Sequence, residues 1–225
     1  MRVESTRPSI GRNAGVLARE TRGVYRPGMQ DDATEEALRQ AVGAVGRMGM
    51  LFLHDARKPS LTALVAGEPI RGSWWGHPAG RRIFQVASAL EERGDVLFVP
   101  LLSAKVTLVH RRLWPALISV GEARAPWQMD PLTPHARELL GEVERAGRVR
   151  ASGPSSKVLA RSLLVHAGQV HTEAASHATE LVSWSEVRRR HSIDQRLAPQ
   201  DARSSLETTA SQLGALSALP WKRMR

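Results

Sequence analysis

The spacing of apolar residues changes period between Thr34 and His110, and this change constrains the fold more than any other feature. Apolar residues first recur every three or four positions, as on one face of a helix, and then follow a β-strand pattern. We therefore expect three helices followed by a β-hairpin, which is the element order of a winged helix-turn-helix unit. The first helix should start at Thr34, with apolar residues recurring as far as Phe52. The other expected ranges are helices at 61–67, 79–92 and 111–120 and strands at 95–102 and 105–110.

A similar order of elements begins again at Thr133, although the two halves share no sequence identity. Thr133 is a good N-cap, and Pro134 suits the first helical position. The expected ranges are helices at 134–147, 154–162 and 186–191 and hairpin strands at 163–172 and 178–184. The predicted fold class is α+β and mainly helical, with two winged helix-turn-helix-like units in tandem, each carrying a β-hairpin.

The 225 residues are enough for two small domains that each bury a core. We expect a loosely attached N-terminal arm, two winged-helix-like units joined by a proline-containing linker, and a basic C-terminal tail of weak periodicity. In that order, the segments are 1–33, 34–124, 125–131, 132–191 and 192–225.

The chain is strongly basic, with a net charge of +10 and a pI of about 11.3. Residues 57–124 contain ten Lys/Arg against five Asp/Glu, and the segment from Arg188 onward contains eight against three. Residues 125–187 are nearly neutral, with six against seven. This pattern predicts a polyanionic partner, first of all DNA, that meets the first unit and the tail. The alternative is an arginine-rich, GC-biased genome that uses arginine as its default polar residue.

Several classes of protein are disfavoured by what the sequence lacks. It has no cysteine, and therefore no disulfide or thiolate zinc site, and no apolar run long enough to cross a membrane. The first residues contain no apolar core of a secretory signal. Nucleotide-binding glycine motifs and metalloprotease motifs are also missing. We expect a cytoplasmic protein without cofactors and without a membrane partner.

The most distinctive segment is the loop from Arg71 to His77, which contains Trp74 and Trp75. Aromatic rings next to cationic side chains can stack on bases and hold phosphates, and the following helix opens with Arg81 and Arg82. Trp74, Trp75 and His77 are therefore candidate base contacts, and the three arginines are candidate phosphate contacts. The alternative is that at least one of the two tryptophans belongs to the core.

Three further clusters are weaker candidates. His110, Arg111 and Arg112 follow the first hairpin and could clamp a DNA backbone, or simply form a solvated helix start. Lys157 and Arg161 lie on the helix that would occupy the recognition position of the second unit. A histidine and glutamate cluster on the second hairpin has no standard metal-ligand spacing, so we expect no metal site. That cluster consists of His166, His171, Glu173 and His177.

Three stretches resemble bacterial tandem winged-helix proteins related to the DNA glycosylases that excise alkylated or crosslinked purines. The stretches are Pro69–Pro78, Val109–Leu117 and Leu164–Glu173, and the resemblance covers about residues 36–190. It implies tandem winged helices, contact with DNA and a role in DNA repair. Those enzymes carry two polar residues flanking one apolar residue, whereas the nearest match here, Gln85-Val86-Ala87, has only one polar residue.

The sequence therefore predicts DNA binding by tandem winged-helix units. Two alternatives remain open. One is a glycosylase-like repair enzyme whose second polar group comes from a distant part of the chain. The other is a protein-interaction module in which the nearly neutral residues 125–187 bind a partner or a second copy.

Overall fold

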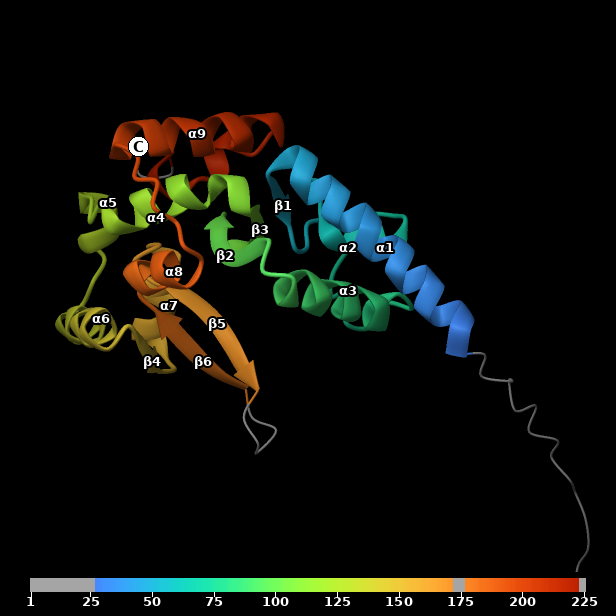
Figure 1. Cartoon of the computed structure of the whole chain (residues 1–225), viewed down its shortest axis with the longest axis horizontal. Helices are drawn as coiled ribbons and strands as arrows, with labels where there is room; N and C mark the ends of the chain where they lie inside the picture. The colour runs from blue at the N-terminus through green and yellow to red at the C-terminus, as the bar shows by residue number, and fades with distance from the viewer. Residues whose placement is uncertain (1–26, 172–176, 223–225) are drawn as a thin grey trace, which may run out of the picture.

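The computed structural model describes residues 27–171 and 177–222, with side chains for residues 32–168 and 179–222. The chain is α+β and mainly helical, and its described part contains two small three-stranded antiparallel sheets. In Figure 1, α1 to α3 lie at one end of the molecule, the second sheet lies at the other end, and α9 lies across α4.

The first sheet is built by the segment that begins with α1 (Pro27–Met48). It continues with β1 (Met50–Phe52), α2 (Leu61–Ala66), α3 (Gly80–Glu92), β2 (Val96–Leu102) and β3 (Lys105–His110). The strand order is β1-β3-β2, with Leu51 paired to Leu108 and Phe98 paired to Leu108 from the other side. The predicted helices at 61–67 and 79–92 and the predicted hairpin are confirmed.

The first helix differs from its predicted bounds at both ends. It begins at Pro27, seven residues before Thr34, and ends at Met48, because Gly49 takes a left-handed φ of 75°. Phe52 therefore lies in a strand and not in the helix. The helix buries a face rich in alanine, including Ala37, Ala41 and Ala44, while the larger Leu38 and Val42 are only partly buried.

The hairpin β2–β3 turns through Ser103 and Ala104, whose φ angles of 57° and 55° fit a two-residue type I′ turn. The tip of this hairpin is not free, because the backbone N–H of Ser103 donates to the carbonyl of Ala218 at 2.7 Å. After β3 the chain forms a short 3₁₀ turn, η1 (Arg111–Leu113), and then the buried helix α4 (Trp114–Glu122).

The second sheet is built by α6 (Pro134–Ala146), β4 (Arg148–Arg150), α7 (Pro154–Arg161), β5 (His166–His171) and β6 (His177–Val182). Its strand order is β4-β6-β5, the same arrangement as in the first sheet. The predicted cap is confirmed, since the Thr133 hydroxyl accepts from the Ala136 N–H at 3.2 Å. Residues 148–153, which lie between two predicted helices and outside every predicted strand, contain the short edge strand β4. Helix α8 (Trp184–Arg190) follows the second sheet.

The expected linker at 125–131 is instead an ordered joint between the two units. It contains α5 (Pro126–Met129), and the fully buried Gln128 side chain fastens this helix to its surroundings. The amide of Gln128 donates to the carbonyls of Gly121 and Ser162, and its oxygen accepts from the Ala125 N–H. One apolar cluster also contains residues of both units, so the two units share a core.

The expected loose C-terminal tail is folded. Helix α9 (Pro199–Gln212) packs against α4 and buries Ala202, Leu206 and Ala210. Lys222 forms an ion pair with Glu207 of this helix at 2.9 Å, and Arg188 of α8 pairs with Glu122 at 3.0 Å. The described part of the tail, 192–222, is therefore folded onto the core and not loosely attached.

Candidate nucleic-acid interface

The loop from Arg71 to His77 leads directly into α3 and is packed against its first residue. A Cβ atom at Gly80 would lie 2.9 Å from the carbonyl oxygen of Trp74 and 3.0 Å from that of Trp75. The N–H of Gly80 donates to the His77 carbonyl at 2.7 Å, and the N–H of His77 donates to the Trp74 carbonyl at 3.1 Å. The loop is therefore held in one conformation by backbone contacts at the start of the helix.

The two adjacent tryptophans have opposite environments. Trp74 is only 9% exposed and belongs to an apolar cluster of the first unit, so its ring is covered and not presented at the surface as a base contact would require. Trp75 is 66% exposed and stacks on Trp74, with ring centroids 4.1 Å apart and planes 23° apart. The core interpretation thus holds for Trp74, and Trp75 is the surface residue.

Phe84 extends the aromatic surface formed by Trp75. It lies one turn into α3, is 44% exposed, and its ring centroid is 6.0 Å from that of Trp75. Trp75 and Phe84 are the two most exposed large apolar side chains among the described residues, and they are in contact range of each other. The sequence did not identify Phe84 as a surface residue, because it lies beside Ile83 and Val86 and was assigned with them to the buried face of the helix.

His77, a predicted base contact, has its ring directed at groups of the protein itself. Its Nδ1 accepts from the backbone N–H of Ala79 at 3.1 Å, so the ring serves the start of α3. Nε2 lies 3.7 Å from a carboxylate oxygen of Glu68, and the His77 side chain is only 22% exposed. Both ring nitrogens are thus directed at groups of the protein itself.

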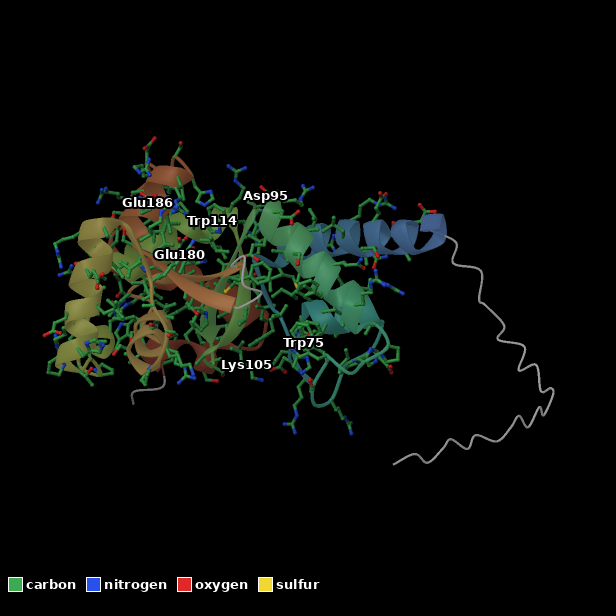
Figure 2. All side chains as sticks on the ribbon, turned by 90° about the horizontal axis from the view of Figure 1, so that it is seen from below. Trp75, Asp95, Lys105, Trp114, Glu180 and Glu186 are labelled. Atoms are coloured by element: carbon green, nitrogen blue, oxygen red, sulfur yellow. The ribbon has the colours of Figure 1, made fainter. Side chains whose placement is uncertain are left out.

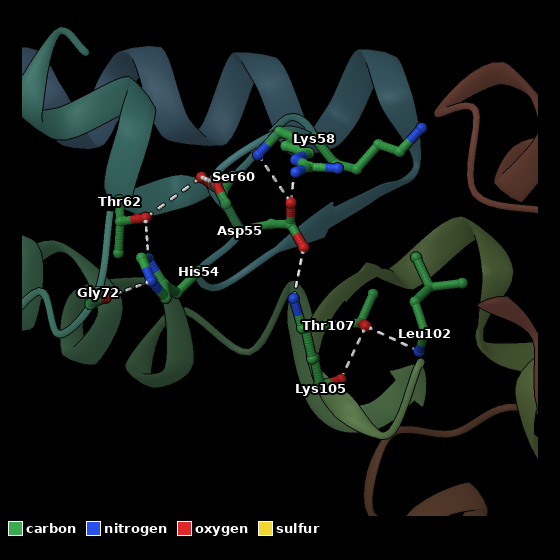
Figure 3. Close-up of polar contacts among 10 residues, drawn as sticks. His54, Asp55, Lys58, Ser60, Thr62, Gly72, Leu102, Lys105 and Thr107 are labelled. Atoms are coloured by element: carbon green, nitrogen blue, oxygen red, sulfur yellow. Dashed lines mark hydrogen bonds and ion pairs between the residues drawn. The ribbon is translucent and has the colours of Figure 1, made fainter. Parts of the chain in front are cut away.

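His54, which the sequence analysis did not select, holds the other end of the loop. Its Nε2 donates to the carbonyl oxygen of Gly72 at 2.8 Å, and its Nδ1 lies 3.0 Å from the Thr62 hydroxyl (Figure 3). This assignment places the proton on Nε2, because only that nitrogen faces an obligate acceptor. The Thr62 hydroxyl in turn contacts the buried Ser60 hydroxyl at 3.2 Å. Gly72 takes a left-handed φ of 82°, which favours glycine at this anchored position.

Figure 3 also shows that the same region is tied to the first hairpin through Asp55. This carboxylate accepts from the backbone N–H groups of Arg57 and Lys58 and from Lys105 Nζ, the last at 2.6 Å. Burial alone would raise the pKa of Asp55, but the Lys105 hydrogen bond and the two backbone donors outweigh burial and lower it. The ionised carboxylate therefore links the loop after β1 to the start of β3.

Arg71, Arg81 and Arg82 are exposed and, among the described residues, form no ion pair. Several other cations of the first unit pair with acids, as Lys105 with Asp55, Arg93 with Asp95 and Arg124 with Glu144 illustrate, whereas Arg47, Arg57, Lys58 and Arg112 also form no ion pair among the described residues. The three free arginines flank the aromatic pair in sequence and at the first turn of α3. We call Arg71, Trp75, Arg81, Arg82 and Phe84 the loop–helix surface.

The cluster at His110–Arg112 lies at the opposite end of α3. Figure 2 shows Trp75 and Asp95 near the two ends of this helix, and Asp95 pairs with Arg111 at 3.7 Å. Arg112 donates to the Arg47 carbonyl at the end of α1, and His110 Nδ1 accepts from the Arg112 N–H. Burial, followed by the charge of Arg112, lowers the pKa of His110. Arg112, one residue of the predicted backbone clamp, thus caps the end of α1. The cluster His110–Arg112 is not part of the loop–helix surface.

Lys157 and Arg161 lie one turn apart on the exposed side of α7, which packs against α6, β2 and β5. Arg161 borders a hollow of about 260 Å³ lined also by Trp127, Val158 and Pro220.

The segment 125–187, predicted as an alternative to bind a protein partner or a second copy, has no exposed large apolar side chain among its described residues. The self-association predicted for that segment therefore remains a prediction without a supporting surface.

Gln85, the single polar residue of the glycosylase-like motif match, is exposed on α3. Val86 is fully buried beneath it, and Ala87 provides no second polar group. Arg81, one turn earlier, and Ser88, nearly one turn later, share the outward side of the helix with Gln85. This side can make hydrogen bonds to a ligand, but its residues do not form the polar pair of the glycosylase motif.

Of the predicted histidine cluster, the structure describes only the His166 side chain; those of His171, Glu173 and His177 lie outside the described residues. Burial, aided by the positive charges of His191 and Arg190, lowers the pKa of His166 to about 4. Within the described ranges, no group of three or more His, Asp or Glu side chains is arranged to hold a metal ion.

No helix in the same ranges has the length and apolar character needed to cross a membrane.

Comparison of the chain with models of protein families, with characterised proteins and with solved structures finds no match.

Proposed function

We propose that the chain binds DNA, and that its two sheets with their helices are winged-helix units. In the first unit, the order α1-β1-α2-α3-β2-β3 supports this assignment, because two helices precede the hairpin as in helix-turn-helix proteins. The second unit repeats the sheet arrangement but has only α7 between β4 and β5. We therefore assign the principal DNA contact to the first unit, with α3 as the helix that enters the major groove.

The observation that carries this proposal is the set of unpaired cations at the start of α3. A protein gains affinity for DNA when its Lys and Arg side chains neutralise phosphates and release counterions. Arg71, Arg81 and Arg82 are exposed and have no acidic partner among the described residues, so their charges are available to phosphates. By contrast, Arg188, Arg189 and Arg190 are paired with Glu122 or Glu186.

The outward side of α3 offers groups suited to base edges as well as to phosphates. Arg81 and Gln85 lie one turn apart and are both exposed. Arginine pairs with guanine and glutamine with adenine through two parallel hydrogen bonds in the major groove. In the proposed complex these two residues reach the groove floor, while Arg71 and Arg82 hold the backbone.

A titration of blunt duplex DNA at several salt concentrations tests the proposal. Replacing Arg71, Arg81 and Arg82 together by alanine should weaken binding and flatten the log–log salt slope by about 2, since the two backbone contacts of Arg71 and Arg82 contribute about 0.9 each. A matched control removes three other exposed arginines, Arg39, Arg145 and Arg189, and thus the same net charge. Equal losses in both variants would show that binding follows net charge alone, and absence of binding at low salt would refute DNA binding.

A further inference from the structure

We propose that Trp75 and Phe84 form a stacking site for an unpaired base, so that the preferred ligand is duplex DNA interrupted by unpaired nucleotides. This inference rests on the proposed DNA binding and specifies the form of DNA that the same surface selects. It starts from the exposure of two neighbouring aromatic rings, which together form an apolar surface open to water.

The geometry of Trp75 leaves one ring face for a ligand. Its other face is covered by Trp74 at a centroid distance of 4.1 Å, so its 66% exposure belongs to the free face and the ring edges. Phe84 stands beside it with planes 42° apart and therefore borders the site as a tilted wall. A planar ligand that stacks on Trp75 would continue the Trp74–Trp75 stack and contact Phe84 at its edge.

The rings are held by a backbone that is already ordered. His54 binds the Gly72 carbonyl at one end of the loop, and the backbone hydrogen bonds from Gly80 to His77 and from His77 to Trp74 hold the other end. The buried Trp74 ring fixes the depth at which Trp75 lies. A preorganised site loses little conformational entropy on binding, which favours affinity.

The charges around the rings identify the planar ligand as a nucleotide base. Arg71, Arg81 and Arg82 supply cations at the same surface, and alternating aromatic and cationic groups are how proteins hold single-stranded nucleic acid. In a regular duplex both faces of each base are covered by its neighbours, and a groove exposes only base edges. The face of Trp75 can therefore be used only by a base that has left the stack.

Extruding a base from a regular duplex costs a few kcal/mol, and this cost is smallest for a base that is already unpaired. A bulge or gap next to duplex DNA would therefore satisfy both parts of the surface at once. Its duplex part would occupy α3 and the arginines, and its unpaired base would occupy Trp75. Single-stranded DNA without a neighbouring duplex would use the rings but leave the groove contacts of α3 unmade.

The experiment compares a blunt duplex, the same duplex with an internal bulge of unpaired thymines, and the isolated single strand, by fluorescence anisotropy. The two duplexes have identical ends, so end stacking cancels. The protein should bind the bulged duplex about 5- to 150-fold more tightly than the blunt one, as expected for one stacked base. Trp75→Ala should weaken binding of the bulged duplex much more than binding of the blunt duplex and so abolish this preference, Phe84→Ala should reduce the preference, and Trp75→Phe should retain part of it.

Thermal melting of each variant accompanies the titrations, and Trp75→Ala should melt close to the parent because the ring is exposed. Equal affinity of the parent for blunt and bulged duplexes, or a preference that survives Trp75→Ala, would overturn the stacking site while leaving DNA binding intact. Tighter binding to the isolated strand would overturn the duplex requirement. If none of the three DNAs binds, the proposed function fails and the stacking site fails with it.

Discussion

Whether the two units form one body can be tested at the contact between Gly121 and Trp184. Gly121 lies in α4, and a Cβ atom there would be 2.2 Å from Nε1 and 2.5 Å from Cδ1 of the Trp184 ring. The ring is only 3% exposed, and its Nε1 donates to the Leu163 carbonyl at 2.6 Å. Gly121→Ala therefore forces α4 and α8 apart or displaces the indole from its hydrogen bond.

The expected loss of stability follows from three effects of different sign. Overpacking of a tight core costs about 1–3 kcal/mol, and a broken hydrogen bond adds about 1 kcal/mol. Alanine is a better helix former than glycine, which returns about 0.5–1 kcal/mol. We therefore expect Gly121→Ala to lower the free energy of unfolding by about 1–3 kcal/mol.

Urea denaturation followed by far-UV circular dichroism measures this change. Gly141→Ala is the matched control, because it lies inside α6 and a Cβ atom there would meet no atom within 4 Å. It should leave stability unchanged or raise it by up to about 1 kcal/mol. In a Trp184→Leu background, which lacks the indole, Gly121→Ala should cost much less. A Gly121→Ala protein as stable as Gly141→Ala would refute the close contact between the units.

Two further predictions concern the packing of the second sheet and of the C-terminal helix. Because the pKa of His166 is lowered to about 4 from 6.5, stability should be complete above pH 6.5 and fall by up to about 3 kcal/mol as pH drops to 4. His166→Gln should remove this part of the pH profile of urea denaturation, whereas His135→Gln, at an exposed position, should leave it unchanged. Identical profiles in all three proteins would contradict a partly buried His166 that is neutral in the folded state. Leu206→Ala should lower the free energy of unfolding by about 2–5 kcal/mol because the side chain is fully buried in α9. Leu216→Ala, at an exposed position of the same segment, should have little effect, and an equally mild Leu206→Ala would indicate that α9 is not part of the core.

Much of the local structure could be predicted where side chains give strong signals. The Thr133 cap with Pro134 marked the start of α6, and Gly67 marked the end of α2 with its left-handed φ of 81°. The hairpin β2–β3 was predictable because β-rich runs surround a two-residue turn. These signals are local, so they do not depend on the rest of the fold.

Elements that depend on distant partners could not be predicted in the same way. Helix α9 buries Ala202, Thr209 and Ala210 with few large apolar residues, so its periodicity is weak in sequence. Those small side chains allow α9 to approach α4 closely. The face of α9 is buried only because α4 covers it, and the sequence of α9 alone does not show that partner. The strand β4 is similar, because its Arg148 and Arg150 are exposed and it forms by pairing with β6.

The adjacent tryptophans show most clearly where sequence reasoning reaches its limit. The apolar cluster between α1, α2 and α3 contains Trp74 as the only aromatic residue among its described buried side chains, so one large ring fills the space between aliphatic residues there. Either tryptophan could supply that ring. The sequence does not say which one does, because neighbouring residues in a loop point in different directions. The backbone decides between them: Gly72 in a left-handed conformation sets the direction in which the chain enters, and the missing Cβ of Gly80 lets α3 close against the carbonyls of both tryptophans. Because the glycines determine which ring faces water, Gly80→Ala should reorient Trp75 and lower the preference for bulged DNA that we propose, as measured by fluorescence anisotropy, without removing any side chain of the loop–helix surface.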